Sequence, residues 1–338
     1  MDTIRIAVDA MGGDNSPGAL VEGAAAALAK RKEIEILLVG PAEELEAELA
    51  KYNIDRERLT VVDAPEVITT DEAPVMAVRR KKNSSLVTAM QLVKKGEAEA
   101  YVSAGSTGAV MVGAQLIIGR MKGISRTPIG AIIPNANGVS LLVDTGANVD
   151  VRPEHLLQFA QMGSVYMEGI MGIKNPRVAL VNVGVEEEKG NALVKEARPL
   201  LAACSTINYI GYIEARDIAY GAADVVVADG FAGNVILKMY EGAGGVLLDK
   251  MKETLTTNLK TKVGALLIKN ELKKTLKAFD INQYGGAPML GLNKLVVKMH
   301  GSSKGKAVYN AICQCEKFYK QRINERIQES MEDGANGL

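Results

Sequence analysis

The chain has 338 residues, 47% of them hydrophobic and 24% charged, a composition typical of packed globular proteins and unlike that of disordered chains. Forty basic residues balance forty acidic ones, which excludes a strong overall charge field that would attract nucleic acid. Three cysteines without a CxxC pair and only two histidines exclude a disulfide framework and a Cys/His zinc site. The first residues lead directly into an apolar segment, so we expect no signal peptide and a cytoplasmic location.

Apolar, β-branched segments recur along the chain and end in Gly, Asp or Ser, a pattern typical of buried parallel strands. In chain order they are residues 4–8, 34–39, 59–62, 100–102, 129–133, 139–143, 178–181, 207–210, 225–228 and 295–299. Helical segments separate many of them, at residues 19–31, 43–52, 85–95, 107–122, 154–172 and 190–203. This repetition predicts an α/β fold with an open, mostly parallel, Rossmann-like sheet and helices on both faces.

The alternation of predicted strands and helices is interrupted once, over residues 234–278. This segment has the pattern of a nearly continuous helix with a break around 262–264. We therefore expect one large α/β domain, residues 1–331, from which residues 234–278 protrude as a helical element. Residues 308–331 predict a closing helix, and residues 332–338 predict a flexible tail.

Turns rich in Gly, Ser, Asn and Asp follow six of the predicted strands. Ligands of open parallel sheets bind at the carboxyl ends of strands, where glycine permits close approach and helix N-termini favour anions. A single such turn is explained by helix capping, but six of them indicate a site for phosphate or another oxyanion. The candidates are Asp9, Gly12, Gly13, Asp14, Gly105, Ser106, Thr107, Gly108, Asp144, Asn148, Asn182, Asp229, Gly230, Asn234, Gly301, Ser302 and Ser303.

Familiar nucleotide and hydrolase signatures are missing from the sequence. No GxGxxG follows the first strand, residues 301–306 do not form a Walker motif, and no GxSxG elbow occurs. The strand-end aspartates are compatible with a divalent metal, but isolated helix caps explain them as well, and we predict neither metal nor cofactor. His300 lies among Gly and Ser after a strand, where it serves as a phosphate donor, a general acid/base or a surface side chain.

Several motifs resemble those of the bacterial phosphate acyltransferases, the PlsX family. They include DAMGGD at 9–14, RRKKNSS at 79–85, SAGSTGA at 103–109, DTGANVD at 144–150 and PEHLLQFAQMGSVY at 153–166. NVGVEEEKGN at 182–191, ADVVVADGFAGNV at 223–235, YGGAP at 284–288 and HGSS at 300–303 continue the similarity, which runs from residue 4 to about 327. The sequence departs from the family at Ser106, where members commonly have Asn, and at Asn15, where they commonly have His.

The resemblance implies a homodimer with a fold similar to phosphate acetyltransferases and isocitrate-type dehydrogenases. It also implies conversion of acyl-[acyl carrier protein] and inorganic phosphate to acyl phosphate, for a membrane glycerol-3-phosphate acyltransferase in phospholipid synthesis. Phosphate attacks a thioester directly, so neither a protein nucleophile nor a cofactor is required. We expect residues 103–108, 229–234 and 300–303 to converge on substrate, with the catalytic candidates His300, Asn234, Asp229 and Lys189, and with Asn182 and Asn191 nearby.

Two other functions stay open from the sequence. The first is a metal- and NAD-dependent decarboxylating dehydrogenase on a related fold, although neither clustered metal carboxylates nor an adenine site is evident. The second is a non-catalytic scaffold for lipid enzymes at the membrane surface.

Two surface features suggest partners. Acyl carrier proteins are strongly acidic, so a run of cations is either their docking site or a solvated charge run; it consists of Arg79, Arg80, Lys81 and Lys82. Residues 260–277 contain six lysines and one acid around a short apolar segment. That segment either packs in a dimer interface or forms a tip that enters an anionic membrane surface; its apolar side chains are Val263, Leu266, Leu267 and Ile268.

Overall fold

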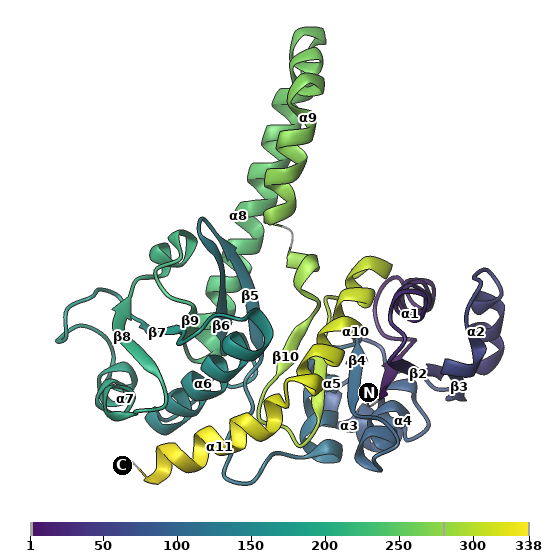
Figure 1. Ribbon diagram of the computed structural model, residues 1–338, viewed down its shortest axis with the longest axis horizontal. Coiled ribbons are helices and arrows are strands. Elements are labelled where there is room, and N and C mark those ends of the chain that lie inside the picture. Colours follow the sequence, from purple (N-terminus) through teal and green to yellow (C-terminus); the bar gives the residue numbers. More distant parts are fainter. Residues whose placement is uncertain (1–2, 280, 337–338) are drawn as a thin grey trace.

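A computed structural model describes residues 3–279 and 281–336 and confirms the α/β class, with the described strands divided between two sheets (Figure 1). The first sheet has the order β10-β11-β4-β1-β2-β3, and neighbours are parallel except β10 against β11. Its strands are β1 (Ile4–Asp9), β2 (Ile34–Gly40), β3 (Leu59–Asp63), β4 (Ala100–Ser103), β10 (Ala287–Met289) and β11 (Leu295–Lys298). The three-residue strand β10 was not predicted from the sequence because it is short, has no β-branched residue and contains Pro288.

The second sheet has the order β5-β6-β9-β7-β8 in the described part of the chain. Its strands are β5 (Gly130–Asn135), β6 (Gly138–Val143), β7 (Arg177–Val181), β8 (Asn208–Ile213) and β9 (Val225–Val227). β5 and β6 form an antiparallel hairpin rather than two parallel strands. Asn135 pairs with Gly138, and a two-residue connection is far too short for the crossover that parallel strands require.

Both faces of the first sheet are buried, as the continuous apolar strands predicted. Ile4, Ile6 and Val8 face α1 (Gly18–Lys30) and α10 (Gly305–Lys320), whereas Ala7 and its neighbours face the other side. There they pack with α3 (Pro74–Arg80), α4 (Ser85–Lys94) and α5 (Thr107–Gly113). The remaining helices of the body are α2 (Ala42–Leu49), α6 (Pro153–Tyr166), α7 (Ala192–Ala203) and α11 (Ile323–Asn336).

Short helical turns complete the described secondary structure. They are η1 (Arg56–Arg58), η2 (Ala114–Ile118), η3 (Met167–Met171), η4 (Ala215–Tyr220) and η5 (Ile281–Tyr284). The predicted helices 107–122 and 154–172 are each an α-helix followed by one of these turns, η2 and η3, and each ends at a glycine with positive φ, Gly119 and Gly172.

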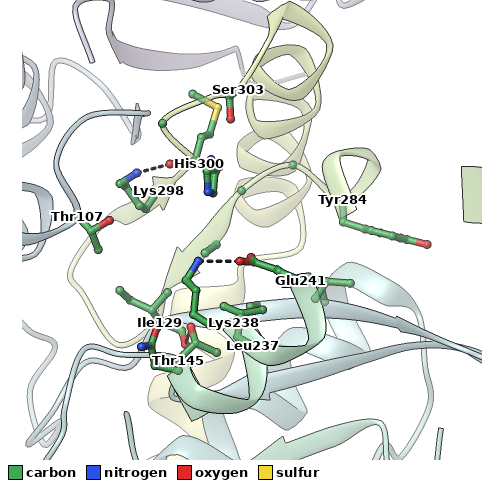
Figure 2. Close-up of a pocket in the computed structure, with 18 residues that line it drawn as sticks. Thr107, Ile129, Thr145, Leu237, Lys238, Glu241, Tyr284, Lys298, His300 and Ser303 are labelled. Atoms are coloured by element: carbon green, nitrogen blue, oxygen red, sulfur yellow. Dashed lines mark hydrogen bonds and ion pairs between the residues drawn. The ribbon is translucent and has the colours of Figure 1, made fainter. Parts of the chain in front are cut away.

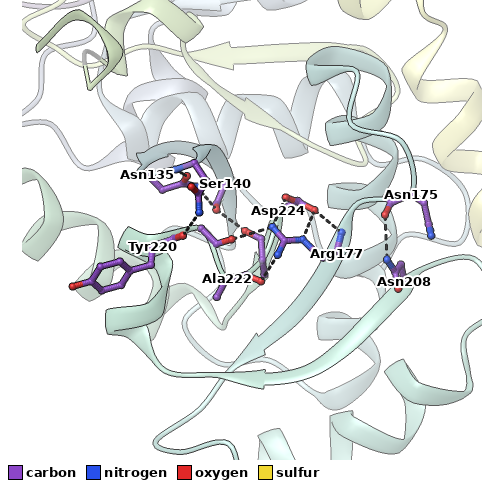
Figure 3. A network of polar contacts seen from close by, with 11 residues as sticks. Asn135, Ser140, Asn175, Arg177, Asn208, Tyr220, Ala222 and Asp224 are labelled. Atoms are coloured by element: carbon purple, nitrogen blue, oxygen red, sulfur yellow. Dashed lines mark hydrogen bonds and ion pairs between the residues drawn. The ribbon is translucent and has the colours of Figure 1, made fainter. Parts of the chain in front are cut away.

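The second sheet is tied together at the amino end of β7 by a polar network (Figure 3). Arg177 forms an ion pair with Asp224 at 3.0 Å and donates to the carbonyl oxygens of Gly221 and Ala222. Ser140 Oγ donates to Ala223 O at 2.6 Å and accepts from Asn135 Nδ2 at 2.9 Å. Because these contacts lie near the amino ends of the parallel strands β7 and β9, they hold the sheet without entering the site at the carboxyl ends of the parallel strands.

The predicted protrusion is a helical hairpin, α8 (Gly230–Thr256) and α9 (Leu259–Ala278), which extends away from both sheets in Figure 1. Its break lies at residues 257–258 rather than at the predicted 262–264. Asn258 Oδ1 accepts from Thr261 N at 3.1 Å and so caps α9, while Gly264 lies inside the helix. α8 begins before residue 234 because Asp229 Oδ1 accepts from Ala232 N at 2.8 Å.

The C-terminal segment differs from its prediction in two respects. The single helix expected at 308–331 is divided into α10 and α11 at Arg322, whose φ is 50°. α11 continues to Asn336, so the tail expected at 332–338 is helical as far as the structure describes it. None of the helices in the described ranges is long and apolar enough to cross a membrane.

Candidate active site

A cavity of about 300 Å³ lies between the two sheets, at the carboxyl ends of β4 and β11 and beside the first turns of α8 (Figure 2). Polar side chains from elements far apart in the sequence line it, together with the glycines of the 285–286 and 301 turns. These side chains are Thr107, Thr145, Asn234, Lys238, Glu241, Tyr284, Lys298, His300 and Ser303. The cavity therefore combines hydroxyl, amide, imidazole and ammonium donors around a small volume, which suits a compact anion.

His300 is exposed at this cavity and its ring is held in place by its own turn. Nδ1 accepts from Ser302 N at 3.2 Å and lies 2.8 Å from Ser302 Oγ. Because Nδ1 accepts the backbone N–H, the neutral ring carries its proton on Nε2. Asn15 Nδ2 donates to the carbonyl oxygens of Ser302 and Ser303 at 3.0 and 3.2 Å, so this residue supports the turn from behind.

The strand-end residues around Asp9 build the wall of the site and do not line the cavity. The Asp9 carboxylate is buried and accepts from Ser103 Oγ at 2.7 Å and from Tyr101 OH at 3.4 Å. Burial raises the pKa of Asp9 and, more strongly, that of Tyr101. Gly12 packs so tightly that an added Cβ would lie 2.5 Å from Gly105 N, which explains Gly12 as a packing requirement.

Asp144 and Asn148, two further strand-end candidates, organise the loop that follows β6. Asp144 Oδ1 accepts from Ile129 N at 3.0 Å, and Oδ2 accepts from the backbone and side-chain nitrogens of Asn148 at 2.7 and 2.9 Å. Burial raises the pKa of Asp144, although these donors oppose the effect. Gly230 N donates to Asn148 O at 2.8 Å, so the loop of residues 144–148 contacts and positions the first turn of α8.

Each of the three motifs expected to converge, at residues 103–108, 229–234 and 300–303, contributes to the lining of the 300 Å³ cavity, and α8 separates this cavity from a second one. Asn234 lies in the 300 Å³ cavity with Thr107, Gly301 and the His300 turn, whereas Asp229 lies in a second cavity of about 520 Å³. This second cavity is mainly apolar, and it also contains the predicted polar residues Asn182 and Asn191. Its apolar side chains include Leu156, Leu180, Val183, Leu193, Val194, Phe231, Val235 and Ile236.

Lys189 is absent from the lining of both cavities. Its Nζ pairs with Glu186 at 2.8 Å, and this pairing raises the pKa of the lysine. Asn182 Nδ2 donates to Lys189 O at 3.1 Å, so the two residues are close through the backbone while the Lys189 side chain turns to Glu186. Asn191 Oδ1 accepts from Val194 N and caps α7.

The other predicted residues of the phosphate set support these walls. Ser106 caps α5 through Ala109 N at 3.5 Å, and an added Cβ on Gly108 would lie 2.7 Å from Pro74 Cγ. Gly13, with φ of 97°, forms the turn that leads to the exposed Asp14, whose backbone N donates to Gly301 O at 2.8 Å.

Five charged or polar residues of the 300 Å³ cavity were not among the predicted site residues: Thr145, Lys238, Glu241, Tyr284 and Lys298. Lys238 and Glu241 pair at 2.7 Å across one turn of α8, a spacing that by itself resembles any solvated helix pair. Lys298 carried a stronger signal, because it is a charge at the end of an otherwise apolar strand.

The two predicted surface features are the cations at residues 79–82 and the apolar segment at residues 263–268. Arg79, Arg80 and Lys82 are exposed at the end of α3, but Lys81 is half-buried and pairs with Glu72 at 2.8 Å, which removes it from the candidate docking surface. On α9, the side chains of the apolar segment are half or more exposed: Val263 at 53%, Leu266 at 69%, Leu267 at 82% and Ile268 at 50%.

Comparison with known proteins assigns the family. The model of a family described as "Fatty acid synthesis protein" matches residues 4–326. The phosphate acyltransferase of Clostridium acetobutylicum is 48% identical over 328 residues, covering 97% of this chain and 99% of the relative. That of Caldanaerobacter subterraneus is 48% identical over 329 residues and covers 97% and 98%. The chain belongs to the phosphate acyltransferase family.

Membership of this family classes the chain as an acyltransferase enzyme of lipid synthesis, as the resemblance implied. Solved structures support the fold alone. A phosphotransacetylase from Streptococcus pyogenes has a TM-score of 0.63 at 20% identity, covering 94% of each chain. A branched-chain phosphotransacylase from Enterococcus faecalis has a TM-score of 0.55 at 13% identity, covering 93% and 98%.

Proposed function

We propose that the protein transfers an acyl group from the thioester of an acyl carrier protein to inorganic phosphate. A phosphate oxygen forms a bond to the thioester carbonyl carbon, the C–S bond breaks, and the carrier thiolate leaves with the electron pair. The products are acyl phosphate and the free carrier thiol. A thiolate has a pKa of about 8.5, so its departure requires little protonation.

The observation that carries this proposal is the chemistry of the 300 Å³ cavity. Its lining combines neutral and cationic donors, among them Asn234, His300 and Ser303, and these groups suit a phosphate ion and a developing oxyanion. In this proposal Asn234 and the Nε2–H of His300 donate to the thioester oxygen as it becomes negative. Holding phosphate and thioester together supplies the rest of the rate enhancement.

The neighbouring 520 Å³ cavity is the proposed site of the acyl chain. Its lining is largely aliphatic, and it shares the wall formed by α8 with the polar cavity. Burial of an aliphatic chain there releases ordered water and favours binding. Asp229, Asn182 and Asn191 also line this cavity, and in this proposal they lie beside the thioester rather than on the phosphate.

The reaction is tested with purified protein, acyl-[acyl carrier protein] and phosphate. We expect stoichiometric release of free thiol and of acyl phosphate trapped by hydroxylamine, and we expect Asn234→Ala to lower kcat about 100-fold. Thiol release without acyl phosphate would indicate a thioesterase. Absence of both products, with a known relative active in the same assay, would refute the proposal, and reduction of NAD by hydroxy acids would favour the dehydrogenase alternative.

We propose three partners for this reaction. The exposed cations Arg79, Arg80 and Lys82 dock the acidic carrier protein. The tip segment of α9 attaches the protein peripherally to an anionic membrane, where a glycerol-3-phosphate acyltransferase would consume the labile product. The protein acts as a homodimer, with the exposed apolar side chains of α8 as its proposed contact surface; they include Met239, Val246 and Leu247, at 70%, 63% and 62% exposure.

A further inference from the structure

A single lysine ends the apolar strand β11, and it is only 8% exposed. The register pairs Lys298 with Ser103 of β4, and Ser103 in turn with Asp9 of β1. Directly paired residues of parallel strands place their side chains on the same face of the sheet. Lys298, Ser103 and Asp9 therefore form one row along the carboxyl edge of the first sheet.

The ammonium group of Lys298 has only carbonyl oxygens as its hydrogen-bond acceptors within the described ranges. Nζ donates to Ala104 O at 3.4 Å and to Met299 O. No carboxylate among the described residues lies within 4.0 Å of it, and the only carboxylate of its row, that of Asp9, already accepts from Ser103 at 2.7 Å. An ammonium group has three donors, so the protein leaves part of this capacity unused.

Burial of this charge without a close counter-ion is unfavourable. It lowers the pKa of Lys298 to about 8, and the more distant negative charges of Asp9 and Asp14 oppose that effect only in part. Such a cost is recovered when an anion binds, because the charge then gains a partner at short range. Lysines on ordinary surfaces carry no such cost, so the position of this one favours a ligand.

Lys298 lines the 300 Å³ cavity together with His300, Ser303 and Thr107 (Figure 2). The cavity contains one other lysine within the described residues, Lys238, but this side chain is exposed and pairs with Glu241 at 2.7 Å. The two lysines therefore differ in kind: Lys238 is already neutralised by a carboxylate, and Lys298 is not.

We propose that Lys298 is the residue that binds the phosphate substrate, through a charge-assisted hydrogen bond to one phosphate oxygen while another oxygen attacks the thioester. This inference rests on the proposed function. It assigns the phosphate to Lys298 and Ser303, and it leaves the thioester oxygen to Asn234 and His300. The ammonium stays protonated throughout and forms no covalent bond.

The test uses Lys298→Met, which keeps an unbranched side chain, one atom shorter, and removes its charge. We expect the KM for phosphate to rise about 10- to 100-fold, the range that corresponds to loss of one charged hydrogen bond. The KM for the acyl carrier protein should change less than about threefold, and Lys298→Arg should restore part of the phosphate affinity. Lys294→Met, at the other end of the same strand segment, is the matched control and should keep both constants.

A binding measurement separates this proposal from the reaction itself. Phosphate alone should raise the Tm of the wild type and of Lys294→Met, but not that of Lys298→Met, because only a binding-competent folded state is stabilised. If phosphate binding depends on Lys298 but no acyl donor yields acyl phosphate, the proposed function fails and the phosphate site stands. If acyl phosphate forms and Lys298→Met keeps the wild-type KM for phosphate, the assignment of Lys298 is overturned.

Should the Met and Arg variants fail to fold, the wild type still decides the question. Saturating phosphate should protect Lys298, but not Lys294, from acetylation by acetic anhydride, read by peptide mass spectrometry. Equal labelling of Lys298 with and without phosphate would overturn the proposal.

Discussion

Gly233 and Asp144 lie so close that a Cβ added to Gly233 would be 1.8 Å from the carbonyl oxygen of Asp144. This contact holds the first turn of α8 against the loop after β6. It therefore sets the position of the neighbouring Asn234, whose side chain lines the 300 Å³ cavity. The glycine is therefore required by close approach of two backbones rather than by an unusual φ.

Gly233→Ala should displace the start of α8. We expect a loss of about 1–3 kcal/mol in the free energy of unfolding, the usual cost of overpacking, together with a lower kcat because Asn234 moves. Urea denaturation and steady-state kinetics measure the two effects. Gly244→Ala, where an added Cβ meets no atom within 4 Å, should instead stabilise the helix by up to about 1 kcal/mol. Equal behaviour of the two variants would contradict the contact.

The buried carboxyl of Asp9 should make the free energy of unfolding fall as pH rises, the opposite of the effect of a carboxylate that is paired with a cation. Burial raises its pKa, so its contribution to stability is complete below its ordinary pKa and is lost as pH rises through the folded value. The free energy of unfolding of the wild type should therefore fall, relative to Asp9→Asn, as pH rises above about 4. Urea denaturation at a series of pH values measures this difference.

Asp55→Asn is the control with the opposite sign. Arg58 lowers the pKa of Asp55, so the contribution of Asp55 is present above its ordinary pKa and is lost as pH falls. Parallel stability curves for the wild type and Asp9→Asn would show that the Asp9 carboxyl is not perturbed by folding.

The α9 tip should be required for membrane binding. Leu266→Glu/Leu267→Glu should weaken co-sedimentation with anionic vesicles more than about tenfold, since two exposed leucines lose their apolar contact with lipid. Val183→Glu/Val185→Glu changes two exposed valines of the body, at 77% and 62% exposure, by the same charge and should bind like the wild type. Loss of the dimer in the tip variant, seen by size-exclusion chromatography, would instead assign these leucines to a subunit interface.

The cations at the end of α3 should control recognition of the carrier protein. Arg79→Glu/Arg80→Glu should raise the KM for acyl-[acyl carrier protein] roughly tenfold at low salt and flatten its salt dependence, while the KM for phosphate stays constant. Lys94→Glu/Lys95→Glu, two exposed lysines at the end of α4, makes the same charge change elsewhere. Unaltered kinetics of the Arg79/Arg80 variant at low salt would place the docking surface on another face.

The sequence by itself determined the local structure and the family. Continuous apolar runs such as 178–181 and 225–228 favour a strand that is covered on both faces, so the strands and the α/β class followed from composition and spacing. Motifs such as 103–109 and 300–303 likewise carried the family resemblance, because they are contiguous. The long helices of the protrusion were also predictable from the sequence, because no segment with the pattern of a strand interrupts them.

Only the tertiary structure decided which residues meet. The sequence gives no register, so it could not place Lys298 beside Ser103, 195 positions earlier in the chain by number, nor show that this charge is buried. It also could not show that α8 separates Asn234 from Asp229. The two residues are only five positions apart, yet Asn234 lines the 300 Å³ cavity and Asp229 lines the 520 Å³ cavity. Side-chain partners such as Glu186 for Lys189 and Glu72 for Lys81 depend on loop geometry. Strand pairing and burial are long-range properties of the folded chain, and they fix which polar groups face a ligand and which only hold the wall.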